Sequence, residues 1–195
     1  SATLGFNYKL NYNNTLFLNH ALSSRAPNPS ELFSDGLHHA IARIEIGDLR
    51  FKSEVGNKTS ITYSHVGKTF NFSINPFINN ISDFIVIEPV EIRETIRGNF
   101  QVWEYRQTDA QLLGMDIDAS LSISDKINLN HQLSIVKGYD KSVNQPLINM
   151  PPVNTKNEIY YNNVECKNLK ITLQSEYVFG QNEFPNNNFQ EKNHQ

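Results

Sequence analysis

Residues 113–135 read LGMDIDASLSISDKINLNHQLSI, and this stretch decides the fold. Apolar side chains alternate with small or polar ones along both of its halves. A period of two residues is typical of a β-strand that shows one face to an apolar environment. Ser124, Asp125 and Lys126 separate the halves and suit a tight turn. We therefore expect two antiparallel strands joined by that turn.

The same alternation recurs on both sides of this stretch. We expect eight strands, at about residues 4–12, 15–24, 53–65, 70–87, 100–123, 127–135, 155–163 and 169–179. Short turns alternate with long connections, and the long ones cover residues 25–54, 88–98 and 137–152. A meander of strands across a bilayer has short turns at one end and long loops at the other. The pattern predicts an all-β, antiparallel up-and-down meander, and its loop lengths favour a transmembrane β-barrel over a soluble sandwich.

The composition fits a barrel and argues against several other classes. The chain has 195 residues, a net charge of -3 and a pI near 6.1, so nothing points to nucleic acid. Its mean hydropathy of -0.47 is low, as expected where lipid-facing and lumen-facing residues alternate. The sequence contains no run of about 18 apolar residues, so no transmembrane helix is predicted. The single Cys166 excludes an internal disulfide and a cysteine-based zinc site.

The longest connection reads RAPNPSELFSDGLHHAIARIEIGDLRFKSE and covers residues 25–54. It is irregular, contains Pro and Gly, and holds several carboxylates and an adjacent pair of histidines. A loop of this length is uncommon inside a compact domain unless it is functional. We therefore expect this loop to contact a ligand or to shape the site that does.

This loop also resembles a signature of TonB-dependent outer-membrane receptors. The signature has Arg-x-Pro, Glu-Leu, Gly-x-His, Glu-x-Gly and a Glu that opens the next strand. The residues that match it here are Arg25 and Pro27, Glu31 and Leu32, Gly36 and His38, Glu45 and Gly47, and Glu54.

Two further segments are similar to the same family, in the same order along the chain. Residues 100–114 resemble its aromatic-Tyr-x-Gln-x-Asp-Ala-x-Leu-x-Gly segment. The matching residues are Tyr105, Gln107, Asp109, Ala110, Leu112 or Leu113, and Gly114. Residues 147–152 (LINMPP) resemble its Leu-Pro-x-Met-Pro-Pro loop.

The resemblance implies a fragment of such a receptor. Residues 1–195 would form a partial β-barrel domain of about eight strands, without the plug domain and the closing strands. The implied location is the outer membrane of a Gram-negative bacterium, with membrane lipid around the wall. The implied function is uptake of a small extracellular ligand: a ferric siderophore, haem or a metal ion. TonB would act through the missing plug, and neither a cofactor nor an enzymatic activity is implied.

Four residues of the long loop are candidate ligand contacts: His38, His39, Asp35 and Glu31. Imidazole and carboxylate groups suit zinc or iron, so His38 and His39 are also candidate metal ligands. The alternative is a structural role, in which Glu31 pairs with Arg25 and holds the loop in shape. The residues expected to be structural through the family signature are Arg25, Pro27, Glu31, Gly36, Glu45, Gly47, Glu54 and Gly114.

Two other functions fit the same pattern of residues. A soluble β-sandwich would solvate its polar face and could bind a glycan through the long loop. A glycoside hydrolase on a β-scaffold could use Asp116 or Asp118, which lie on one face of a strand. The isolated His20, His65 and His131 are expected to be strand-surface residues.

Overall fold

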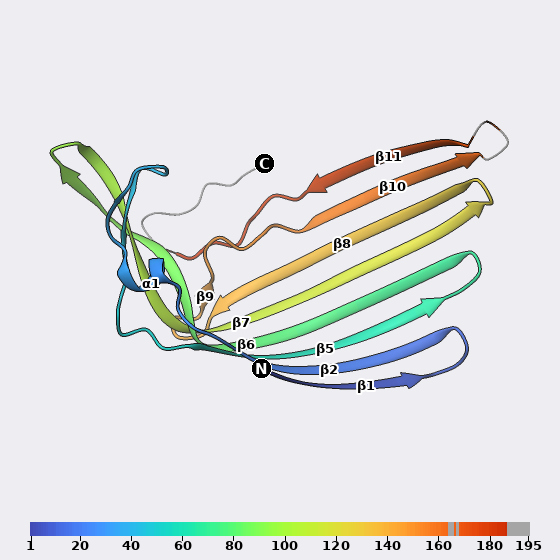
Figure 1. Ribbon diagram of the computed structural model, residues 1–195, viewed down its shortest axis with the longest axis horizontal. Helices are drawn as coiled ribbons and strands as arrows, with labels where there is room; N and C mark the ends of the chain where they lie inside the picture. Colours follow the sequence, from blue (N-terminus) through green and yellow to red (C-terminus); the bar gives the residue numbers. More distant parts are fainter. Residues whose placement is uncertain (164–165, 167, 187–195) are drawn as a thin grey trace.

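A computed structural model describes residues 1–163, 166 and 168–186, and it shows one curved sheet (Figure 1). Its strands follow one another in the order β1-β2-β5-β6-β7-β8-β10-β11. They are β1 (Ala2–Lys9), β2 (Asn14–Arg25), β5 (Glu54–Val66), β6 (Phe70–Thr95), β7 (Gly98–Ser124), β8 (Ile127–Asp140), β10 (Asn154–Asn163) and β11 (Leu169–Val178). The long connections hold α1 (Pro29–Phe33), β3 (Asp35–His38), β4 (Arg43–Ile46) and β9 (Gln145–Pro146).

This arrangement confirms the predicted meander. Each strand of the sheet order pairs antiparallel with the one before it. The β-sandwich alternative is wrong, because the described residues form a single layer with no second sheet packed on it. β1 and β11 do not pair with each other within the described residues, so the sheet is open there. No described helix is long and apolar enough to span a membrane.

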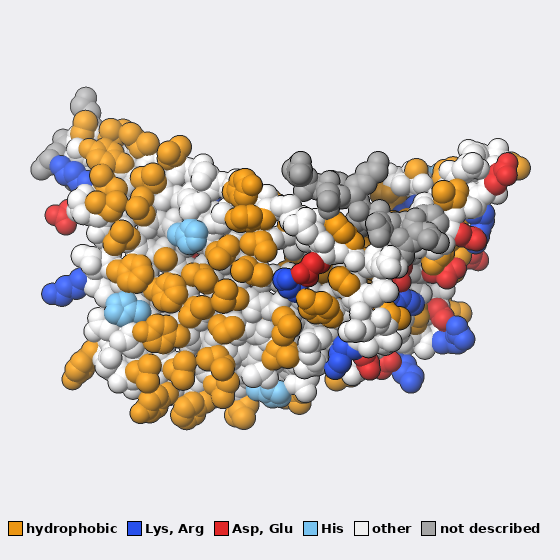
Figure 2. Space-filling model, turned by 180° about the vertical axis from the view of Figure 1, so that it is seen from behind, with side chains coloured by type: hydrophobic (Ala, Val, Ile, Leu, Met, Phe, Trp, Pro, Cys, Tyr) orange, Lys and Arg blue, Asp and Glu red, His pale blue; other side chains and the backbone are white. Residues whose placement is uncertain are grey.

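The register gathers the apolar side chains of the strands on one face. Ile117 of β7, for example, lies between Ile74 of β6 and Leu133 of β8. We call this side of the sheet the apolar face. Its larger side chains include Leu4, Phe6, Tyr8, Leu16, Leu18, Ile61, Tyr63, Phe72, Ile74, Ile78, Leu113, Met115, Ile117, Leu121, Leu129, Leu133, Ile135, Ile159, Ile171 and Leu173. Figure 2 shows hydrophobic side chains spread over the strands, whereas most charged side chains gather at one end.

The opposite side, which we call the polar face, carries mainly amide, hydroxyl and charged groups. Its members include Lys58, Ser60, Thr62, Ser73, Asn75, Asn79, Asp116, Asp118, Ser120, Asn130, Gln132, Ser134, Lys156, Glu158 and Glu176. A sheet with this division separates an apolar environment from a hydrated one.

The buried apolar side chains lie near the long connections rather than under the sheet. Ile44, Ile85, Val86, Val102, Ala110, Leu147 and Ile148 are at most 7% exposed. On the apolar face, by contrast, Leu4 is 76% and Phe6 62% exposed. The only compact apolar packing among the described residues therefore supports the loop end, which is where the candidate ligand contacts were expected.

The prediction of a charged connection over residues 88–98 is wrong. β6 and β7 both continue through this region and form the tip of a long hairpin (Figure 1). The pairing register shifts between Ile81 and Phe84, and again between Pro89 and Glu91. Each shift places an extra residue in β6, and this interrupts the period of two by which the strand is recognised.

Gly114 makes room for an aromatic ring on the polar face. A Cβ added at Gly114 would lie 2.3 Å from Cζ of Phe77 and 2.8 Å from the carbonyl oxygen of Ile135. Phe77 is the residue directly opposite on β6. Lys58 Nζ lies 4.2 Å from the centre of the same ring, within the range of a cation–π contact. The family-like glycine is thus explained by packing.

We expect Gly114→Val to destabilise the sheet by roughly 1–3 kcal/mol, the usual cost of forcing extra methyl groups into a packed site. The free energy of unfolding in urea measures this. Thr62→Val, an isosteric change on the same face, serves as the matched control. Equal stability of the Gly114 variant and the wild-type protein would contradict the packing account.

Candidate functional site

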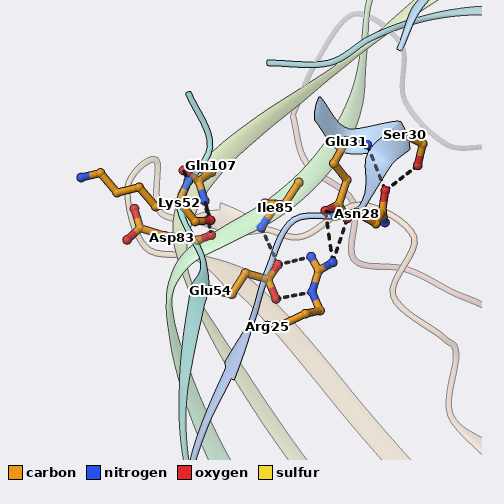
Figure 3. Close-up of polar contacts among 9 residues, drawn as sticks. All are labelled: Arg25, Asn28, Ser30, Glu31, Lys52, Glu54, Asp83, Ile85 and Gln107. Carbon is orange, nitrogen blue, oxygen red and sulfur yellow. Dashed lines mark hydrogen bonds and ion pairs between the residues drawn. The ribbon is translucent and has the colours of Figure 1, made fainter. Parts of the chain in front are cut away.

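Arg25 joins the ends of two strands to the first helix (Figure 3). Its Nε and Nη2 atoms donate to Glu54 at 2.7 and 2.6 Å, and its Nη1 atom donates to Glu31 at 3.0 Å. The side chains of Glu31 and Glu54 are 9% and 10% exposed, whereas that of Arg25 is 45% exposed. The hydrogen bond to Glu54, together with that to Glu31, outweighs partial burial and raises the pKa of Arg25. We call these three residues the Arg25 junction.

Backbone groups complete the Arg25 junction. Glu54 Oε1 accepts a hydrogen bond from the Ile85 N–H at 2.8 Å, which ties β5 to β6 just beyond the first bulge. Glu31 accepts from the Asn28 N–H at 2.8 Å, and the Asn28 side chain accepts from the Glu31 N–H at 3.0 Å. This capping box, with Pro29 at the first helical position, explains why α1 begins there.

Two glycines of the signature allow the loop to fold back on α1. A Cβ added at Gly47 would lie 2.5 Å from the carbonyl oxygen of Glu31. The Gly47 N–H donates to the Ser34 carbonyl at 2.7 Å, so the chain passes close to the helix. Gly36 has a φ of 150°, a conformation that favours glycine. Pro27 is half-buried in the segment between β2 and α1.

The loop is also fastened to β6 and β7. Gln107 donates to the carbonyls of Lys52 and Asp83, both at 2.8 Å, and accepts from the Lys52 N–H at 3.0 Å (Figure 3). Burial raises the pKa of Tyr105, whose hydroxyl interacts with Ser30 of α1. Two residues of the Tyr-x-Gln segment therefore hold the loop that carries the first signature.

The hairpin of β3 and β4 has one anchored strand and one outer strand. β4 pairs in parallel with β7, which places Glu45 opposite Trp103. The Arg43 guanidinium lies 4.7 Å from the centre of the Trp103 ring and donates to Glu45 at 2.7 Å. β3 pairs with β4 alone, and His38 ends it. β3 therefore lies on the side of β4 that is away from β7.

The structure separates the four candidate ligand contacts into two groups. His38, His39 and Asp35 are exposed on the hairpin, whereas Glu31 is buried in the Arg25 junction. In the part of the chain that the structure describes, no three His, Cys, Asp or Glu side chains are grouped so that they could hold a metal ion. A ligand role for the histidine pair stays a prediction.

Sequence reasoning misses a second polar junction, formed by Arg106, Glu88 and Asp140. Arg106 donates to Glu88 at 2.7 and 2.6 Å and to Asp140 at 2.6 Å. Asp140 is 2% exposed and accepts from the Thr108 hydroxyl at 2.6 Å. Burial acts to raise the pKa of Asp140, but the hydrogen bonds from Thr108 and Arg106 lower it. This junction holds the end of β8 against β7, as the Arg25 junction holds β2 and β5.

The two carboxylates considered for hydrolysis have ordinary partners on the neighbouring strand. Asp116 accepts from the Ser134 hydroxyl at 2.8 Å, and Asp118 accepts from the Gln132 amide at 3.0 Å. Such contacts are typical of a hydrated strand surface, and they give no support to an acid–base pair.

A one-layer sheet with an apolar and a polar face, and with folded loops at one end, defines part of the wall of a large β-barrel. The chain belongs to the TonB-dependent receptor family: residues 1–192 match the family model described as "TonB dependent receptor-like, beta-barrel". A comparison with curated proteins finds no match.

Several solved structures share this fold. The copper transporter OprC is similar with a TM-score of 0.75 and 18% identity, over 93% of this chain and 26% of that protein. The siderophore receptor PirA from Acinetobacter baumannii gives a TM-score of 0.60 and 18% identity, over 82% of this chain and 26% of PirA. A mutant of the ferric enterobactin receptor PfeA from Pseudomonas aeruginosa gives a TM-score of 0.67 and 15% identity, over 94% of this chain and 28% of PfeA.

At these identities the likeness shows the fold alone. The chain spans about a quarter of the length of OprC and PirA. The proteins that it resembles are named as transporters and receptors.

Replacing Arg25 by Met tests the Arg25 junction. The change keeps the aliphatic stem but leaves two buried carboxylates without their cation, so we expect a loss of roughly 2 kcal/mol, less than for a fully buried pair. Hydrogen exchange over residues 28–52 should become faster. Arg50→Met, at an ion pair whose arginine is 88% exposed, is the control and should change little. Equal exchange in the two variants would argue against the junction.

The ion pair between Asp48 and Arg50, near the end of the long loop, can be tested through the pKa of Asp48. The side-chain hydrogen bond from Arg50 lowers the pKa of Asp48 from 3.8 to about 2. Because the pKa of Asp48 is lowered in the folded state, its ion pair with Arg50 stabilises the turn at pH values above the ordinary pKa of 3.8. This stabilisation is lost as the pH falls through about 2. In an NMR titration of the carboxyl carbon, Arg50→Met should return the midpoint towards 3.8. A midpoint that does not move would show that Arg50 is not the cause.

Proposed function

We propose that this chain forms part of the wall and outer rim of an outer-membrane receptor that takes up a metal-containing ligand. The ligand class is a ferric siderophore, haem or a metal ion. Family membership supports the proposal, as do the names of structurally similar proteins, which include a copper transporter, a siderophore receptor and an iron transporter.

The two-faced single layer is the observation that carries this function. A mainly apolar surface that extends over all the strands is far larger than a soluble monomer normally exposes to water. Lipid is the environment that such a surface fits, and the polar face then lines a hydrated interior. The backbone groups between neighbouring strands are hydrogen-bonded, as a membrane-spanning sheet requires.

The loop end is the part of the chain suited to meet the ligand. In this proposal the exposed His38, His39 and Asp35 contact the ligand at the extracellular rim, while Glu31 keeps the loop in place through Arg25. Imidazole can ligate haem iron or a metal ion directly and can hydrogen-bond a siderophore.

Energy for uptake is proposed to come from TonB through a plug domain, as in the family. This chain would supply the wall and the loops, and the plug and the remaining strands would belong to other parts of the same receptor. The membrane lipid around the apolar face is the second proposed partner.

Uptake by the complete receptor tests the function. Cells that produce the receptor, in a strain without its own uptake systems, are offered ferric enterobactin, haemin or copper(II), each with a traceable metal. We expect accumulation of at least one probe, and we expect loss of that accumulation when TonB is deleted. A receptor found in the soluble fraction, or uptake of all probes unaffected by TonB, would contradict the proposal.

The histidine pair is tested by His38→Ala combined with His39→Ala. If the pair contacts the ligand, binding of zinc or haemin to the purified receptor should weaken about tenfold or more, because losing even a residue that orients a metal ligand costs about 10–100-fold in affinity. The double change His20→Ala with His65→Ala, on the apolar face, is the matched control. Unchanged affinity for both probes would remove the pair from the site.

A further inference from the structure

The wall is lower at β10 and β11 than at the neighbouring β7 and β8. β10 and β11 have 10 residues each, whereas β7 has 27 and β8 has 14. Figure 1 shows both short strands ending well before β7 and β8 on the loop side. Residues 151–153 and 179–182, which continue from them, are irregular, and none of these residues is buried. Irregular backbone does not face lipid within the hydrocarbon layer, so this layer cannot rise above the two strands.

A row of polar side chains also crosses the apolar face halfway up these strands. The register places His131 of β8 opposite Asn157 of β10, and Asn157 opposite Ser175 of β11. All three residues are exposed. His131 Nδ1 lies 2.7 Å from Asn157 Oδ1, so the first two members of the row are in contact with each other. Polar groups at this position are costly in hydrocarbon and favourable next to headgroups or water.

The row leaves only a short apolar stretch below it. On β7 the apolar side chains of this face run from Leu113 to Leu121, which are eight positions apart. On β10 the large apolar side chains of this face are Ile159 and Tyr161, two positions apart. At about 3.3 Å per residue and a tilt near 40°, these stretches are roughly 20 Å and 5 Å tall. The apolar wall is therefore much lower along β10 than along β7.

Side chains typical of a membrane interface lie directly above the row. Tyr177 is two positions beyond Ser175 on β11, is 60% exposed, and meets Phe179 edge to face with ring centres 4.8 Å apart. Beyond β11 the chain crosses to β8, where Glu183 pairs with Lys137 on the apolar face. Tyrosine is enriched at the level of the headgroups, and charged groups avoid hydrocarbon. The edge of the hydrocarbon layer is thus expected near the row.

The other polar pair of the apolar face has a different setting. His20 of β2 lies 3.0 Å from Thr59 of β5. These strands have 12 and 13 residues, so regular paired backbone continues above the pair. Polar side chains and short strands coincide at β10 and β11.

We propose that the outer leaflet of the membrane is thinned along β10 and β11, where lipid headgroups and water descend to the row of His131, Asn157 and Ser175. A wall with too short an apolar stretch is accommodated when the bilayer thins beside it. Asn157 and Ser175 are too short to reach the ordinary headgroup level by extending their own side chains. This inference rests on the proposed outer-membrane location.

Spin labels at Ser175 and Ile117, one at a time in the complete receptor in lipid vesicles, test the thinning. Every native cysteine, including Cys166, is first replaced by Ser. Ser175 is six positions from the short-turn end of β11, and Ile117 is seven from that of β7, so a uniform bilayer would bury both labels equally. The ratio of oxygen access to access of a water-soluble nickel complex reports the depth. We expect the label at Ser175 to lie roughly 10 Å closer to the headgroups than the label at Ile117.

His131→Leu combined with Asn157→Leu extends the apolar stretch of β10 by two positions. The Ser175 label should then move deeper by about 5 Å. Leu129→Ile combined with Ile159→Leu, which exchanges apolar residues on the same strands, is the matched control and should leave the depth unchanged. Equal depth of the two labels, or a depth at Ser175 unaffected by the leucine changes, would overturn the proposal. Low access of both reagents at Ser175 would overturn it as well, because a polypeptide would then cover the row. A receptor missing from the membrane fraction would instead overturn the proposed function.

Discussion

A sheet one layer thick must find a suitable environment for each of its faces. In this chain the register places large apolar side chains on one face of every strand and polar groups on the other. Neither face is covered by a second layer among the described residues. A bilayer outside and water inside satisfy both faces at once, and the proposed uptake function depends on that separation. On the polar face, the Phe77 ring packs over Gly114, where a larger residue would not fit.

The rim depends on a small number of buried charges. Where the strands leave the regular sheet, Arg25 and Arg106 each bind two carboxylates from different segments. Glu31, Glu54 and Asp140 are buried and Glu88 is partly buried, so breaking these pairs costs more than breaking an exposed pair such as Arg50 with Asp48. A fixed base allows the β3–β4 hairpin to present His38 and His39 outward. In the proposed function, different residues therefore fix the loop and contact the ligand.

Much of this fold could be predicted from sequence because a period of two residues directly encodes which face a side chain occupies. The strand between Leu113 and Ile123 shows this clearly. The outer half of β6 could not be recognised from sequence, because the bulge beyond Ile81 inserts one residue and reverses the alternation of apolar and polar side chains. The pairing of Arg106 with Asp140 could not be predicted either, because the two residues are 34 positions apart and no local pattern links them. The parallel pairing of β4 with β7 is a long-range contact of the same kind.

The central claim is that the two faces of the sheet meet lipid and water respectively, and spin labels along β7 test it most directly. Labels placed one at a time at Met115, Asp116, Ile117 and Asp118 of the complete receptor in lipid vesicles report their access to oxygen and to a water-soluble nickel complex. Oxygen access should be high at Met115 and Ile117, and nickel access high at Asp116 and Asp118. Equal access at all four positions, or the opposite alternation, would contradict the account.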